Sequence, residues 1–253
     1  MSTIVRYPVA IFVISLLALW LSVQAGAWIA RKTRPLAEGE RDDLDLVISS
    51  GLTLLALIIG FSFSMAVSRY DQRKNYEEEE ANAIGTEYVR ADLLPPGEAA
   101  KVKQLLVQYL DQRLLFYEAK EWESKTAIDA ETTRLQNEMW STVAGVAKTQ
   151  QTPMIALAVS GMNDVLNRQG YTQAAWWNRI PTGAWVMMAT LSICCSALIG
   201  YGTHQRSAKL YTIMPFLVSI AFFMIADIDS PRRGVIRVAP QNLISLSQSL
   251  HGQ

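Results

Sequence analysis

The chain has 253 residues, of which 50% are hydrophobic and 18% are charged, and its mean hydropathy is +0.14. Because soluble domains carry about 25% charged residues, this composition excludes an ordinary soluble domain, while the charges exclude a chain that lies wholly in lipid. Lysines plus arginines number 23, as do aspartates plus glutamates, so the net charge says nothing about partners. We expect the lipid bilayer as a partner and no nucleic acid.

Four stretches of the chain contain no charged residue and predict transmembrane helices in two hairpins. A helix needs about 20 residues to cross a hydrocarbon core of about 30 Å. The first stretch has an alternative interpretation as a cleaved signal peptide, because its VQAGA resembles a cleavage site, although it is longer than a usual signal core. The spans are expected at about 7–30, 46–68, 181–203 and 210–226, of which the last is short and contains Pro215.

The polar residues between the two hairpins predict a helical domain, because apolar residues recur there at three- and four-residue spacing without a competing strand pattern. The second helix is expected to continue unbroken from about residue 46 to about residue 93. We therefore expect an all-α membrane protein. Its regions are hairpin 1 at 1–68, a cytoplasmic helical domain at 69–179, hairpin 2 at 180–226 and a cytoplasmic tail at 227–253.

Residues 60–80, GFSFSMAVSRYDQRKNYEEEE, cover the exit of the second helix from the membrane. Arg69, Arg73 and Lys74 are predicted to meet phosphates in the headgroup layer and to attract ions. The glutamates at 77–80 are interpreted as a solvated helix face, since four successive residues spread around most of a helix. The basic residues favour anions and the glutamates favour cations, so the sign of the ion stays open on these residues.

Residues for catalysis or metal binding are scarce. The only histidines are His204 and His251, and the only cysteines, Cys194 and Cys195, are adjacent within an apolar stretch. No CxxC, HExxH, GxSxG or glycine-rich phosphate loop occurs. We therefore expect no catalytic residue, no metal and no cofactor, and a protein that is not an enzyme. The predicted spans contain no charge, which favours passive conduction over proton-driven transport.

Three segments together, at 60–75, 178–185 and 226–246, resemble the bestrophin superfamily of ion channels, and more closely the bacterial membrane proteins called bestrophin-like. A fourth segment, at 79–95, resembles the bacterial bestrophin-like group itself. Their order and spacing cover most of the chain, although no one of them is specific. They are GFSFSMAVSRYDQRKN at 60–75, EEANAIGTEYVRADLLP at 79–95, NRIPTGAW at 178–185 and ADIDSPRRGVIRVAPQNLISL at 226–246.

The resemblance implies a ring of identical subunits, often five, with the second helices around a central pore for small inorganic ions. It also implies a multi-pass protein of the bacterial inner membrane with its termini and middle domain in the cytoplasm. Basic residues beside the spans are slightly more frequent on that side, which agrees with this orientation.

The family's constriction residues, carried over by their one-turn spacing before the GF pair, fall on Thr53, Leu57 and Phe61. A ring of such side chains can gate a pore by dewetting, since a narrow apolar passage does not replace an ion's water shell. The alternative is that these residues simply pack against a neighbouring helix. Small residues on the same helix predict a helix-packing seam, made of Ala56, Gly60 and Ser64.

The acidic cluster that binds calcium in animal bestrophins is reduced here to Asp227 and Asp229, followed by Arg232 and Arg233. Two carboxylates are few for a cation that takes 6–8 oxygen ligands. We therefore predict an Asp–Arg salt-bridge network at the membrane surface and no metal site.

The leading functional hypothesis is a homo-oligomeric channel that conducts small ions, with anions as the expected species. The alternative is a non-conducting membrane scaffold or sensor whose cytoplasmic helices bind a partner.

Overall fold

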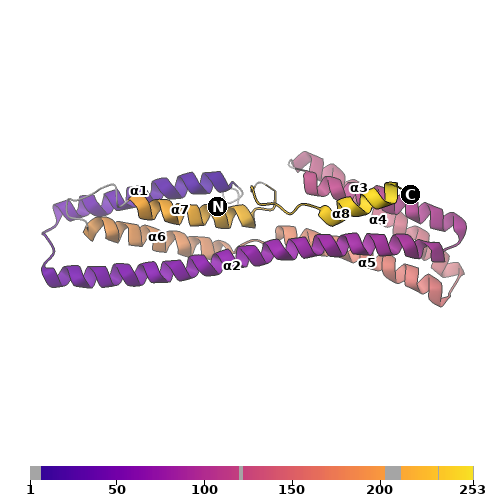
Figure 1. Ribbon diagram of the computed structural model, residues 1–253, viewed down its shortest axis with the longest axis horizontal. Coiled ribbons are helices and arrows are strands. Elements are labelled where there is room, and N and C mark those ends of the chain that lie inside the picture. The colour runs from indigo at the N-terminus through magenta and orange to yellow at the C-terminus, as the bar shows by residue number, and fades with distance from the viewer. Residues whose placement is uncertain (1–6, 120–121, 203–211, 233, 253) are drawn as a thin grey trace. The chain divides into compact units, whose positions relative to one another are not determined.

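The computed structural model describes residues 7–119, 122–202, 212–232 and 234–252. Within these ranges every regular element is a helix, so the all-α prediction is confirmed there (Figure 1). The elements are α1 (Pro8–Lys32), α2 (Glu38–Arg90), the 3₁₀ helix η2 (Ala91–Leu93), α3 (Pro96–Glu118), α4 (Trp122–Thr149), α5 (Pro153–Trp177), α6 (Thr182–Gly202), α7 (Ile213–Asp229) and α8 (Gln241–His251).

Three helical stretches are long and apolar enough to cross a membrane: Pro8–Lys32, Gly39–Leu93 and Pro153–Gly202, the last comprising α5 and α6. The fourth predicted span, 210–226, begins in the segment 203–211, which lies outside the described residues. Its described part is α7, which has 17 residues and carries charges only at its end, Asp227 and Asp229.

The second helix is one element, as predicted. It has 53 residues from Glu38 to Arg90 and passes directly into η2. No proline occurs between Pro35 and Pro95, so no residue in this range lacks the backbone N–H that a helix needs or forces a kink. Pro95 and Pro96 then end the helical run and begin α3, with Pro96 in the first turn, where its missing N–H costs nothing.

The chain divides into two compact units, which are described separately. Unit 1 comprises Met1–Arg69 and Arg179–Arg237, and unit 2 comprises Tyr70–Asn178 and Val238–Gln253. Helix α2 contributes residues to both units. The predicted tail is shared as well, since its first residues belong to unit 1 and α8 belongs to unit 2.

In unit 1, helix α1 packs against α6 and α7, and glycines allow the closest approach. A Cβ atom at Gly26 would lie 2.0 Å from the Ala197 carbonyl oxygen, and one at Gly200 would lie 2.0 Å from the Val23 carbonyl oxygen. The Ser22 hydroxyl donates a hydrogen bond of 2.7 Å to the backbone of α6. Small residues let two helix backbones meet in this way, where van der Waals packing is the main attraction between helices in lipid.

Unit 2 has one hydrophobic core, to which α2, α3, α4, α5 and α8 all contribute. The apolar stripes that the sequence places on α3, α4 and α5 lie in this core, so the prediction that they pack helix against helix is confirmed. Helix α5 is N-capped by Thr152, whose hydroxyl accepts a hydrogen bond from the Ile155 amide. Core members from the predicted stripes are Val102, Leu105, Leu106, Tyr109, Leu110, Leu135, Met139, Val143, Val146, Ile155, Met162 and Val165.

Candidate functional site

The residues proposed for the pore constriction lie on a face of α2 that the chain itself leaves open. Leu57 and Phe61 expose 53% and 62% of their surface, and Thr53 is also exposed. On the opposite side of the helix, Leu55, Ser62 and Ala66 are buried, because they are about half a turn away from the first set. The fold therefore makes this face available to lipid, to another subunit or to a pore.

The predicted packing seam, Ala56, Gly60 and Ser64, is exposed too, and no heavy atom lies within 4 Å of a Cβ built at Gly60. Among the described residues, nothing packs against the open side of Gly60. The small residues that do bring α2 close to another helix include Gly51, where a Cβ would lie 3.0 Å from Cys195 Sγ of α6. A seam at Gly60 therefore requires a neighbour from outside the chain, and it stays a prediction.

The three basic residues expected at the membrane exit have different surroundings. Arg69 is mostly buried in unit 1, with its Nη1 atom 3.7 Å from Asp229 Oδ1. Arg73, in unit 2, is only 1% exposed, and Lys74 is exposed. The sequence predicted three exposed cations at the membrane exit, but two of them are largely buried. Arg69 and Arg73 are four residues apart and therefore lie on the same, inward side of the helix. Among the three, only Lys74 presents its charge at the surface of the chain.

The glutamate run is not the solvated face that the sequence suggested. Glu77 and Glu80 are buried in unit 2, while Glu78 is exposed and Glu79 is partly exposed. Positions 77, 80 and 84 have three- and four-residue spacing, so the two glutamates continue the stripe that brings Ile84 into the core. The helical spacing therefore decides which glutamates are buried, because a residue on the inward side of a helix is buried whether it is charged or apolar.

Glu80 forms the most deeply buried contact of the run. Its carboxylate pairs with Arg113 of α3 through Nε, and neither side chain is exposed. Its Oε2 atom also accepts a hydrogen bond of 3.0 Å from Thr172 of α5. The Arg113 guanidinium lies 4.4 Å from the ring centroid of Phe116. A buried ion pair needs such additional partners, because desolvation otherwise exceeds the Coulombic gain.

Burial and the negative charge of Glu80 together raise the pKa values of two nearby tyrosines, Tyr109 and Tyr117. Burial, the largest single effect on Arg113, lowers its pKa, but the attraction and hydrogen bond of Glu80 together with the two tyrosines outweigh burial, so the pKa of Arg113 is raised. The tyrosines stay neutral and Arg113 stays charged at physiological pH. The contacts of Glu80 join α2, α3 and α5.

Two of the three remaining glutamates also bind other helices, α8 and α5. Glu77 accepts hydrogen bonds from the Leu243 amide at 2.9 Å and from Asn242 Nδ2 at 2.7 Å, so it caps the first turn of α8. Glu79 pairs with Arg168 of α5, at side-chain exposures of 42% and 38%. Glu77, Glu79 and Glu80 thus connect α2 to α8, α5 and α3, and this short run fastens unit 2 together.

Sequence reasoning missed Arg113 and Thr172. A signal for Arg113 was present, since it follows Leu106 and Leu110 at helical spacing in the apolar stripe of α3. A lone arginine at a core position predicts a buried acidic partner, because an unpaired charge there is costly. Nothing in the local sequence indicates that the partner is Glu80.

In unit 1, Asp227 and Asp229 at the end of α7 bind neighbouring segments of the backbone. Asp227 accepts hydrogen bonds from the Val235 and Ile236 amides at 2.7 and 2.8 Å. Gly234 permits this turn, since a Cβ there would lie 2.4 Å from the Asp227 carbonyl oxygen. Both Asp227 oxygens therefore accept N–H bonds, which suits a clasp on the chain and does not suit a calcium site.

Asp229 binds the Ile180 amide, at 3.2 and 3.3 Å from its two oxygens, as well as Arg69. The predicted Asp–Arg contact thus includes Arg69, an arginine that the sequence assigned to the membrane exit. Arg232 is partly buried, and Arg233 lies outside the described residues. In the part of the chain that the structure describes, no three acidic, histidine or cysteine residues form a group that could hold a metal ion.

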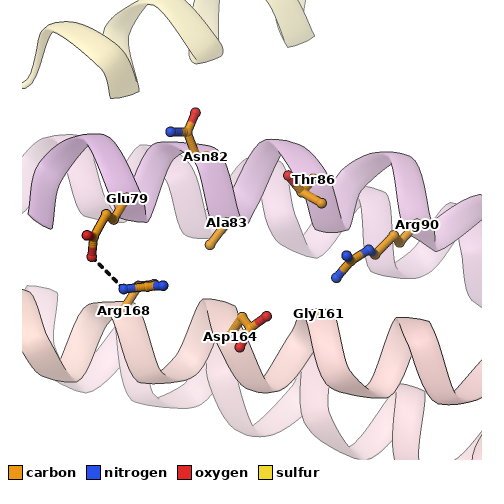
Figure 2. Close-up of a pocket in the computed structure, with 8 residues that line it drawn as sticks. All are labelled: Glu79, Asn82, Ala83, Thr86, Arg90, Gly161, Asp164 and Arg168. Atoms are coloured by element: carbon orange, nitrogen blue, oxygen red, sulfur yellow. Dashed lines mark hydrogen bonds and ion pairs between the residues drawn. The ribbon is translucent and has the colours of Figure 1, made fainter.

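Unit 2 also contains a polar cavity of about 370 Å³ between α2 and α5. Figure 2 shows the Glu79–Arg168 pair at one end, with Arg90 and Asp164 reaching into the space between the two helices. No hydrogen bond or ion pair of Arg90 or Asp164 side chains occurs among the described residues. The lining residues are Glu79, Asn82, Ala83, Thr86, Arg90, Gly161, Asp164 and Arg168.

An all-helical chain with three stretches able to cross a membrane, one of which continues into a helical unit with its own core, is an integral membrane protein. A bestrophin-like domain matches residues 9–243, which is most of the chain. The chain therefore belongs to the bestrophin-like family, as its sequence motifs implied. No curated protein matches it.

Solved structures of a bacterial bestrophin homologue from Klebsiella pneumoniae share the fold. A tryptophan-to-alanine variant matches with a TM-score of 0.66 and 11% identity, over 97% of each chain. An isoleucine-to-threonine variant matches with a TM-score of 0.63 and 12% identity, over 97% of this chain and 99% of that one. A leucine-to-threonine variant gives 0.63 and 14%, over the same shares. At these identities the likeness concerns the fold alone.

Proposed function

We propose that the protein is a homo-oligomeric channel, a pentamer by analogy with its family, that conducts small inorganic ions, chiefly anions. Its four membrane spans are those expected from the sequence, at about 7–30, 46–68, 181–203 and 210–226. Unit 2 and both termini lie in the cytoplasm, and the host membrane is the bacterial inner membrane. The observation that carries the proposal is the open face of α2, where Thr53, Leu57 and Phe61 face away from the rest of the chain.

The physical argument concerns water in a narrow apolar passage. In a ring of subunits, repeated Leu57 and Phe61 side chains form a constriction that offers no polar atom to a dehydrated ion. Truncating the larger side chain widens the constriction and lowers the barrier. The open face alone does not distinguish pore from lipid, so the experiment compares two phenylalanines on the same helix.

The test records ion currents of the purified full-length protein in planar bilayers, under chloride and sodium gradients. Phe61→Ala is expected to increase the conductance several-fold. Phe63→Ala is the matched control, because Phe63 is also exposed but lies about 200° around the helix. It is expected to leave conductance unchanged, and the reversal potential in the chloride gradient gives the sign of the ion.

Currents absent under both gradients, with no opening by Phe61→Ala, would refute conduction and leave the scaffold or sensor hypothesis. Equal effects of both phenylalanine substitutions would remove Phe61 from the constriction. A chain that is monomeric both in detergent and in lipid excludes a ring-shaped pore altogether.

A further inference from the structure

Glu87 on α2 is a buried carboxyl group without a hydrogen-bond partner. Its surface exposure is 0%, and neither Oε1 nor Oε2 has a partner among the described residues. Glu80, two turns earlier, is equally buried but has Arg113 and Thr172 as partners. Because buried polar groups are nearly always paired, the difference between these glutamates needs a physical reason.

Helix α5 covers Glu87 at a glycine. A Cβ atom at Gly161 would lie 2.0 Å from Glu87 Oε2 and 2.7 Å from Arg90 Nη1, so no larger residue fits without a shift. Gly161 also lines the polar cavity between α2 and α5, beside Arg90 and Asp164. The buried carboxyl group of Glu87 thus lies against Gly161, a residue that also lines the polar cavity.

The charged groups that act on Glu87 are Arg90 from its own helix and Asp164 from α5. Burial raises the pKa of Glu87 from its ordinary value of 4.5 to about 8, with Arg90 opposing and Asp164 supporting the rise. Glu79 and Arg168, farther along the cavity, are paired with each other. A neutral carboxyl group is therefore the form that fits the closed contact at neutral pH.

We propose that Glu87 makes the contact between α2 and α5 proton-sensitive: the protonated side chain keeps the helices packed at Gly161, and loss of the proton opens the contact toward the polar cavity. In the open form the carboxylate reaches water and the Arg90 guanidinium. This inference concerns unit 2 alone, and it holds whether or not the protein conducts ions.

The direction of the pH dependence follows from linkage. Below the ordinary pKa of 4.5, Glu87 is protonated in both forms, so pH has no effect through this residue. Between that value and about 8, the open form releases the proton and the closed form keeps it, so the opening equilibrium rises about tenfold per pH unit. Above about 8 both forms are ionised, and the equilibrium levels off.

The test measures amide hydrogen exchange of the full-length protein in lipid nanodiscs, from about pH 5 to about pH 9, as protection factors corrected for the intrinsic effect of pH. Protection around Gly161 in α5 is expected to fall with rising pH in the wild type and to level off near pH 8. Glu87→Gln is expected to keep that segment protected throughout. Glu78→Gln, which changes an exposed carboxyl group on the same helix, is expected to follow the wild type.

Infrared spectroscopy gives a second readout, whose wild-type part does not depend on any variant folding. In the wild type, we expect the carbonyl stretch of a protonated carboxyl group at neutral pH, and we expect this band to disappear near pH 8. The band is expected to be missing in Glu87→Gln. The proposal is overturned if wild-type protection is independent of pH, if Glu87→Gln keeps the wild-type pH profile, or if the infrared band is absent at neutral pH.

Discussion

Removal of the Glu80 charge is expected to destabilise unit 2 far more than removal of the neighbouring Glu79 charge. Glu80→Gln leaves the Arg113 guanidinium buried without its counter-ion, at a site where neither side chain is exposed. Breaking a buried pair by removing one partner costs about 3–5 kcal/mol. Glu79→Gln breaks the partly exposed pair with Arg168, and such pairs contribute about 0–1 kcal/mol.

The assay is pulse proteolysis of the full-length protein in detergent micelles over a urea series, which reports the fraction of unfolded unit 2. The double variant Glu80→Gln with Arg113→Met tests the mechanism further. It is expected to cost less than the sum of the two single variants, because the unpaired charge is gone. Equal costs for Glu79→Gln and Glu80→Gln, or additive costs in the double variant, would refute the argument from burial.

Two further predictions concern the glycine seam of unit 1 and the cap of α8. Gly26→Ala is expected to lower the free energy of unfolding by about 1–3 kcal/mol, and with it the thermal unfolding temperature, because the new Cβ meets the Ala197 carbonyl. Gly60→Ala is the control, because the space around Gly60 is open. Equal shifts of the unfolding temperature in the two variants would contradict this reasoning. Glu77→Gln is expected to speed hydrogen exchange of the α8 amides by about tenfold, since a charge-assisted cap is lost. Glu78→Gln is the control and is expected to leave hydrogen exchange in α8 unchanged, because Glu78 is exposed. An unchanged exchange rate in Glu77→Gln would show that Glu77 does not cap α8.

The long second helix shows which features could be derived without tertiary information. Its length and continuity depend on the absence of proline and on hydrogen bonds between residues four apart, so they are local. The stripes of α3, α4 and α5 were predictable for the same reason, because a period of 3.6 residues identifies a buried side before its partner is known. The order of the motifs also indicated the bestrophin-like family.

Charged residues on α2 could not be assigned in this way. The partners of Glu80 lie 33 and 92 residues away in the sequence, and the Leu243 amide lies 166 residues from Glu77. A run of four glutamates is typical of a solvated face, and only the position of α3, α5 and α8 around α2 shows which members are buried. The same holds for Arg69, whose partner Asp229 follows a different apolar stretch.

Local periodicity and composition thus decided the helical class, the apolar stretches, the continuous second helix and the family. Tertiary structure decided which sides of those helices are covered: it buried Glu77, Glu80 and Glu87 and left Leu57 and Phe61 open. The physical reason is that a helix forms from hydrogen bonds within its own segment. Whether a charged side chain can be buried, or an apolar face stays exposed, depends instead on residues that the fold brings from elsewhere in the chain.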